Sequence, residues 1–254
     1  MPPIVRARAL SGMVLMASVA LDRPAAIAAG EEAVAIFERT GEDLAGYGLV
    51  LRRLATVETF WDNLDRAESL LVRAHEVALR AGSPWLLGWA LTQHGLLRSF
   101  RGDADQAARM SAEAERAVRE VGDPEVLGFA TLLGADAARS LAGPAAGADQ
   151  LCAALRGFQE AELSWSISMA FYSAAGFFRD LGRPHDEVML LAAGVELRRS
   201  TAGAFWLRLS RHQDARIAQL RETLDPGEFD TQWKTGSTRS TSELIQYVCE
   251  QLPR

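Results

Sequence analysis

The stretch that decides the fold is Leu91–Ala114, which reads LTQHGLLRSFRGDADQAARMSAEA. A turn beginning at Gly102 separates two runs of helical periodicity, with small residues on both sides of it, at Gly95 before the turn and at Ala107 and Ala114 after it. Because seven residues make two helical turns, Ala107 and Ala114 share one face of the second helix and let another helix approach closely. The stretch predicts a hairpin of two helices packed through small side chains.

The same spacing recurs along the chain. Turns begin at Leu21, Asp62, Gly102, Ala142 and Gly182, at intervals of 41, 40, 40 and 40 residues. Small residues stand seven positions before each turn start and five and twelve positions after it, and we call these three sets the small-residue columns. The columns comprise Val14, Ala55, Gly95, Ala135 and Ala175; Ala26, Ala67, Ala107, Gly147 and Glu187; and Ala33, Ala74, Ala114, Ala154 and Gly194. Only Glu187 breaks the pattern, so we expect a repeated hairpin.

The columns predict an all-α protein. We expect a right-handed α-α solenoid of about five hairpins, each about 40 residues long, over residues 1–203, followed by C-terminal capping helices over 204–254. The expected helix pairs are 4–20 with 24–39, 43–61 with 64–81, 84–101 with 104–121, 124–141 with 145–162, and 165–181 with 185–200. Glycines at 41, 82 and 122 are placed to end helices in the left-handed conformation, and Ser240 with Glu243 has the pattern of a capping box.

The hairpin at 91–114 resembles the tetratricopeptide repeat. Gly95, Gly102, Asp103, Ala107 and Ala114 stand where that repeat has Gly, Gly, Asp, Ala and Ala. The unit here is longer, at about 40 residues rather than the ~34 of a tetratricopeptide unit. The resemblance implies lengthened helices and a concave surface lined by the first helix of each hairpin.

The C-terminal part is similar to the sensor region of bacterial LuxR-type and MalT-like ATPase regulators. Residues 181–184, 190–193 and 196–198 resemble the last repeat of that region, and 215–224 the helix that follows it. The motif that closes this region in such regulators has the spacing of Phe229, Trp233, Gly236 and Ser240. The chain departs from the residues usual in the family at Glu187, Asp225 and Leu244. Such regulators usually carry an ATPase module before the repeats and a DNA-binding module after them. The resemblance therefore implies a sensor segment, with those modules on a longer or neighbouring chain.

Composition excludes several functions. The formal net charge is −6, so the chain lacks the basic field that would bind nucleic acid by itself. Lys234 is the only lysine and follows no glycine-rich loop, which excludes a phosphate-binding Walker A loop. No apolar run reaches the ~18 residues of a membrane helix. Cys152 and Cys249 fit no metal or redox spacing, so we expect buried small hydrophobic residues in a cytoplasmic protein.

The predicted concave surface holds the candidate binding residues. Fixed offsets from the first-helix column place one set of side chains on this inner wall: Arg52, Trp89, Thr92, Phe129, Arg139, Tyr172 and Arg179. The arginines would offer forked donors to a carboxylate or phosphate group on a partner, beside aromatic contact area. The alternative interpretation is that arginine is the commonest cation in this chain and merely faces solvent.

Binding is therefore the expected function. The histidines are scattered and no nucleophile has a histidine partner in the sequence, so we predict no catalytic residue, no metal and no cofactor. We expect a non-catalytic module of a bacterial transcription regulator that binds a peptide, a protein or a small effector in its groove. The alternative is a free-standing scaffold protein unrelated to transcription.

Overall fold

The chain is helical throughout the residues that the computed structural model describes, which are 1–200 and 207–253, with the side chains of 200 and 207–211 left out. No strand occurs in those ranges, so the all-α prediction is confirmed. The expected domain boundary between residues 203 and 204 lies outside the described residues. The helices are α1 (Pro3–Val19), α2 (Arg23–Thr40), α3 (Leu44–Phe60), α4 (Leu64–Arg80), α5 (Pro84–Phe100), α6 (Ala104–Val118), α7 (Pro124–Ala142), α8 (Pro144–Glu160), α9 (Ser164–Asp180), α10 (Pro184–Ser200), α11 (Leu207–Thr223), α12 (Pro226–Thr238) and α13 (Thr241–Gln251).

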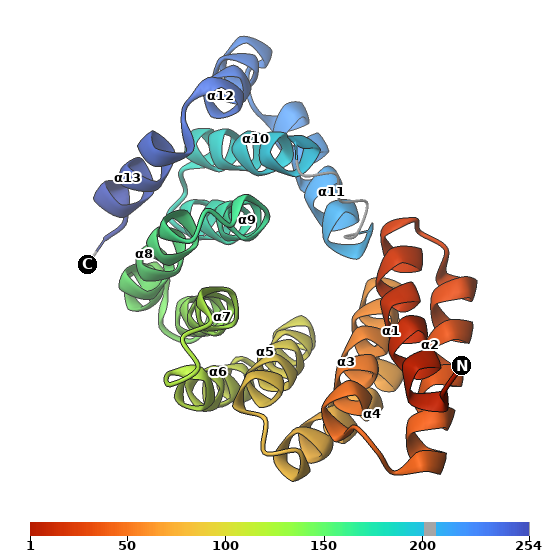
Figure 1. Cartoon of the computed structure of the whole chain (residues 1–254). Helices are drawn as coiled ribbons and strands as arrows, with labels where there is room; N and C mark the ends of the chain where they lie inside the picture. Colours follow the sequence, from red (N-terminus) through yellow and green to blue (C-terminus); the bar gives the residue numbers. More distant parts are fainter. Residues whose placement is uncertain (201–206, 254) are drawn as a thin grey trace.

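Helices α1 to α10 form a curved double layer (Figure 1). Consecutive helices pack on each other, and α1, α3, α5, α7 and α9 also contact their odd-numbered neighbours, so these five make a continuous inner layer. The remaining helices of the series lie outside them. Helix α11 contacts both α10 and α3, and it therefore bridges the two ends of the curve.

The ends of the helices follow from local sequence. All ten expected helices are present, and their ends agree with the prediction within three residues. Gly82 has a φ of 58°, a conformation that favours glycine, and Ser83 then caps α5 by accepting a hydrogen bond from the Leu86 backbone N–H at 3.3 Å. Proline at the first position of α5 fits the free N-terminus of a helix, since proline donates no hydrogen bond.

The small-residue columns are the contact points between helices. Every residue of the three columns is buried, including Glu187. At Gly147 an added Cβ would overlap the backbone carbonyl oxygen of Ala135, so α8 touches the main chain of α7 at this point. At Gly95 an added Cβ would overlap the side chain of Leu133. The columns thus set how closely the helices approach.

The last two helices cover the end of the helical series. Ser240 and Glu243 form the expected capping box at the start of α13, whose apolar stripe is buried. Phe229 and Trp233 stack with ring centroids 5.7 Å apart, and Gly236 packs against the backbone carbonyl of Met189 in α10. The spacing of the closing motif therefore has a packing reason, because a side chain at residue 236 would collide with α10.

The two cysteines correct a prediction. Cys152 in α8 and Cys249 in α13 are buried as expected, but they form a disulfide with Cα atoms 5.6 Å apart. Their separation of 97 residues carries no recognisable motif, because the capping helix α13 returns to α8 only in the folded chain. The bond fastens the cap to the helical series.

Overpacking of the columns tests this account of the fold. Ala74→Leu and Ala114→Leu place a large side chain at fully buried contacts, and each should lower the free energy of unfolding by ~1–3 kcal/mol. Ala112→Leu is the matched control, because Ala112 is exposed on the same helix as Ala114. Urea unfolding of the three variants provides the measurement, and equal losses at all three positions would contradict the assignment of the columns.

Reduction tests the link between α8 and α13. The disulfide closes a long loop, so dithiothreitol should lower the free energy of unfolding by ~3–5 kcal/mol. The double variant Cys152→Ala, Cys249→Ala should show the lower stability from the outset and no response to dithiothreitol. Equal stability of the oxidised and reduced wild-type protein, measured by denaturant unfolding, would contradict a stabilising role for this bond.

Candidate functional site

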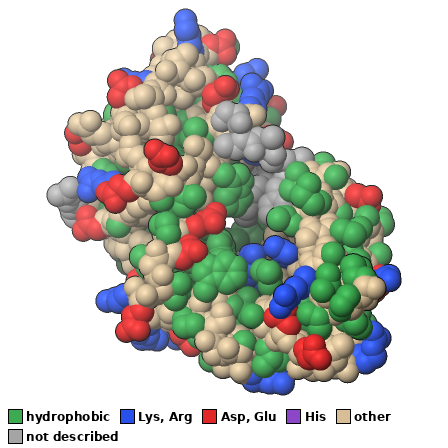
Figure 2. Space-filling view, viewed as in Figure 1, with side chains coloured by type: hydrophobic (Ala, Val, Ile, Leu, Met, Phe, Trp, Pro, Cys, Tyr) green, Lys and Arg blue, Asp and Glu red, His purple; other side chains and the backbone are tan. Residues whose placement is uncertain are grey.

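A cavity of about 800 Å³ occupies the inside of the curve. Its lining comes from α1, α3, α5, α7 and α9, with further side chains from α4, α10 and α11. Figure 2 shows the hollow near the middle of the molecule, with hydrophobic side chains and basic groups around it. Cavities of ~300–1,000 Å³ are typical of small-molecule sites.

All seven candidate binding residues line this cavity. They come from four helices of the inner layer: Arg52, Trp89, Thr92, Phe129, Arg139, Tyr172 and Arg179. The offsets from the small-residue columns therefore locate the wall of the cavity. Thr92 uses its hydroxyl to donate a 2.8 Å hydrogen bond to the Gly88 carbonyl, so it contributes mainly its methyl face.

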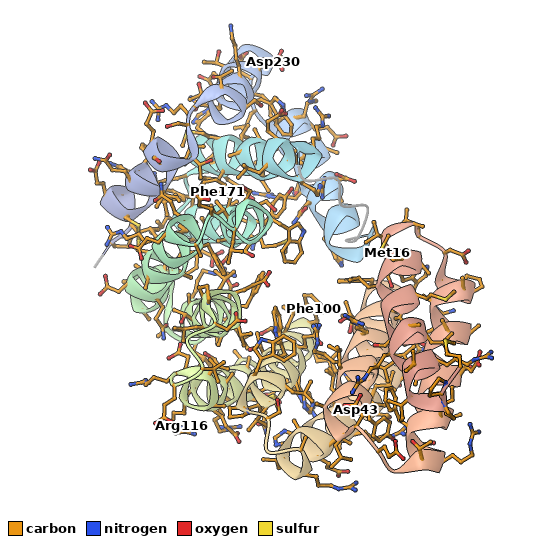
Figure 3. All side chains as sticks on the ribbon, viewed as in Figure 1. Met16, Asp43, Phe100, Arg116, Phe171 and Asp230 are labelled. Atoms are coloured by element: carbon orange, nitrogen blue, oxygen red, sulfur yellow. A yellow bond between two sulfur atoms is a disulfide. The ribbon has the colours of Figure 1, made fainter. Side chains whose placement is uncertain are left out.

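Aromatic rings form one side of the cavity. Phe129 lies at the centre of a cluster, with its ring centroid 5.8 Å from Trp89, 5.1 Å from Phe158 and 5.6 Å from Trp165. Phe100 adds a further ring from the inner side of α5 (Figure 3). Large rings packed edge against face make a rigid apolar surface, which suits the body of a flat or extended ligand.

Two of the three predicted arginines already contact a carboxylate. Arg139 donates to Asp180 at 2.5 Å, lies 3.5 Å from Asp136 and stands over the ring of Phe177 at 5.2 Å. Arg179 is more exposed, and its Nε lies 3.7 Å from Asp180. The expectation that all three arginines offer free forked donors is therefore corrected for Arg139, because its charge is balanced within the protein.

Arg52 is different. No carboxylate of the described residues lies within ion-pair distance of it, its Nε is buried without a hydrogen-bond partner, and its guanidinium stands 4.9 Å from the centre of the Trp89 ring. Burial, with the neighbouring charge of Arg53, lowers the pKa of Arg52 to about 10. Arg53 has neutral partners, because it donates to the carbonyl and hydroxyl oxygens of Ser11 at 2.7 and 2.9 Å. Sequence reasoning did not select Arg53.

Other buried polar atoms of the cavity also lack partners. Besides Arg52 Nε, these atoms are Gln93 Oε1, Arg139 Nε, Tyr172 Oη and Gln213 Nε2. Buried polar groups in proteins are nearly always hydrogen-bonded, so such a concentration in one cavity marks a place for a ligand or water. Burial also raises the pKa of Tyr172 to about 12, and its hydroxyl, protonated at neutral pH, can donate a hydrogen bond.

Two carboxylates of the lining, Glu125 and Asp136, are partly buried. Burial raises the pKa of Glu125 despite a 3.3 Å hydrogen bond from the Ser166 hydroxyl. Burial likewise raises the pKa of Asp136, which accepts a 2.7 Å hydrogen bond from Ser173. The offset of one residue from Ala135 places Asp136 on the inner wall, although it is not among the seven candidates, whereas no offset used reaches Glu125.

An ion pair joins α11 to α10 beside the cavity. Arg216 donates two hydrogen bonds to the buried carboxylate of Glu187, at 2.8 and 2.7 Å. Glu187 is the residue that breaks the small-residue columns, and the structure supplies the reason, since it ties α10 to α11. His212 and Gln213 of the same helix also line the cavity.

Comparison with known proteins adds no family. No protein-family profile matches the sequence, and no curated protein matches it. Within residues 1–200 and 207–253, no helix is both long and apolar enough to cross a membrane, and no group of three or more His, Cys, Asp and Glu side chains could hold a metal ion.

The Glu187–Arg216 pair can be tested by a double-mutant cycle. Arg216→Ala leaves a buried carboxylate without its cation and should lower the free energy of unfolding by ~3 kcal/mol. Adding Glu187→Ala restores a small residue to the column and should recover most of that loss. Urea unfolding of both single variants and the double variant gives the coupling energy. Additive losses would show that the two side chains do not act as a pair.

Proposed function

We propose that the chain is a non-catalytic effector-sensing module that binds a small ligand in its central cavity. The observation that carries this proposal is a cavity of about 800 Å³ whose wall holds an unpaired arginine, Arg52, and further buried polar atoms without partners. A protein keeps such groups where a bound molecule satisfies them, because leaving them unsatisfied costs free energy.

The closure of the curve favours a small effector over a peptide. Helix α11 contacts α3 as well as α10, so the inner surface is bounded on the side where an open solenoid would admit an extended chain. The hydroxyls of Ser18, Thr59 and Thr92 bond to backbone carbonyls and that of Ser173 bonds to Asp136. No hydrogen bond joins a described hydroxyl of the lining to a histidine. This arrangement supports recognition rather than nucleophilic catalysis.

The wider setting rests on the sequence resemblance. The small-residue columns support five tetratricopeptide-like hairpins in a right-handed solenoid, and the C-terminal motif supports the sensor region of a bacterial transcription regulator. Ligand binding between α3 and α11 would then be passed to ATPase and DNA-binding modules on a longer or neighbouring chain. The second candidate is a free-standing scaffold, which would not need unpartnered polar atoms in a cavity of ligand size.

Filling the cavity tests ligand binding. Phenylnaphthylamine, a neutral dye that fluoresces in apolar sites, should bind the wild-type protein, and Ser99→Trp should weaken that binding by about tenfold or more because residue 99 lines the cavity. Ser69→Trp is the matched control, because Ser69 is exposed on α4. Fluorescence titration gives the affinities, and circular dichroism checks the fold.

A second filling variant, Leu96→Trp, carries the same test should Ser99→Trp fold poorly, since Leu96 also lines the cavity. Absence of dye binding to the wild-type protein, or equal binding by the cavity and control variants, would contradict a ligand-binding cavity.

A further inference from the structure

The charge of the cavity is opposite to that of the whole chain. The protein carries a formal net charge of −6. The described lining nevertheless holds five arginines, at 52, 53, 139, 179 and 216, against three acidic residues, at 125, 136 and 187. Burial raises the pKa of two of those acids, Glu125 and Asp136. A cationic interior within an anionic protein selects for negatively charged ligands.

The unbalanced part of this charge is localised. Arg216 is neutralised by Glu187, and Arg139 by Asp180. Arg52 and Arg53 are adjacent on α3, and no described carboxylate forms an ion pair with either of them. Glu125 of the lining attracts Arg52 from beyond ion-pair distance and opposes the lowering of the Arg52 pKa only in part. The serine oxygens that bind Arg53 orient its guanidinium without cancelling its charge. The two arginines therefore leave a positive potential beside Trp89.

The surroundings of this charge are apolar. The ring centroids of Trp89 and Phe129 lie 5.8 Å apart. Leu96, Leu132 and Met169 extend the same apolar lining. An inorganic anion would satisfy the arginine but leave this surface uncovered. A purely apolar molecule would cover the surface but leave the buried Nε of Arg52 without a partner, which is the costlier omission.

We propose that the cavity binds an amphipathic organic anion, with its acidic group on Arg52 and its apolar body against Trp89 and Phe129. This inference rests on the proposed function and names the class of its effector. Arg52 offers forked donors suited to a carboxylate, sulfonate or phosphate group, and Arg53 reinforces the attraction from the next position on α3. The unpartnered hydroxyl of Tyr172 and the unpartnered amide nitrogen of Gln213 provide hydrogen bonds for a polar substituent elsewhere on the ligand.

Two dyes of nearly the same shape separate charge from shape. Anilinonaphthalene sulfonate is an anion, and phenylnaphthylamine is the same ring system without the sulfonate. The wild-type protein should bind the sulfonate dye more tightly. Arg52→Met keeps a side chain of similar length but removes the charge. It should weaken binding of the sulfonate dye by about 10- to 100-fold and change the affinity for the neutral dye little.

The controls distinguish failure of this inference from failure of the proposed function. Arg116→Met makes the same substitution at an exposed position on α6, outside the cavity, and should leave both dyes unchanged (Figure 3). Arg52→Met should melt at the same temperature as the wild-type protein or higher, because it removes a buried charge without a partner.

Three outcomes would overturn a proposal. Equal affinities for the two dyes in the wild-type protein, unaffected by Arg52→Met, would contradict the proposal of an anionic ligand but leave the ligand-binding cavity in place. A marked fall in melting temperature with equal loss of both dyes would make Arg52 a structural residue. Failure of the wild-type protein to bind either dye would instead remove the proposed function itself.

Discussion

Close contact between helix backbones at the small-residue columns is the constraint on which the remaining structure depends. Gly147 brings α8 against the carbonyl of Ala135 in α7, and Gly95 leaves the room that Leu133 fills. Because such contacts recur at intervals of about 40 residues, each first helix is held at the same rotation about its axis. Side chains at fixed offsets from the column then face the same way. Arg52 and Tyr172 share one wall of the cavity for this reason, although they belong to helices far apart in the chain.

The departure from the repeat matters as much as the repeat itself. An alanine at position 187 would continue the column and allow another hairpin to pack in the same manner. Glu187 instead brings a buried charge to that contact, and a buried charge requires a partner. Arg216 supplies it with two hydrogen bonds, which turns α11 inward toward α3. The one departure from the pattern thus lies where stacking gives way to closure, and α11 adds a further boundary to the concave surface.

The sequence was sufficient for the features that repeat and insufficient for those that arise from closure. Helix ends and the seven candidate residues of the lining follow from periodicity, caps and column offsets, all of which are local or recur in each hairpin. The disulfide between Cys152 and Cys249 and the contribution of Gln213 depend on segments that meet only after the chain has curved round. Pairing of Arg139 with Asp180 was missed for a related reason, since a register gives the direction of a side chain but not its partner. Contacts between distant elements leave no periodic trace in the sequence.

The arginines of the cavity divide by what balances their charge. Arg139 and Arg216 are held by carboxylates of the protein, so they shape the wall and keep their geometry whatever the cavity contains. Arg52 stands on an aromatic ring with its Nε unbonded, an arrangement that stabilises the charge only in part. Folding must offset the cost of this group through apolar burial elsewhere, and the helical core is large enough to do so. A residue without a partner lowers the stability of the unliganded protein. A ligand that pairs with this residue removes that cost when it binds, and the free energy recovered contributes to its affinity. Arg52, whose charge has no ion-pair partner in the described protein, is therefore the residue through which a ligand can most increase the stability of the structure.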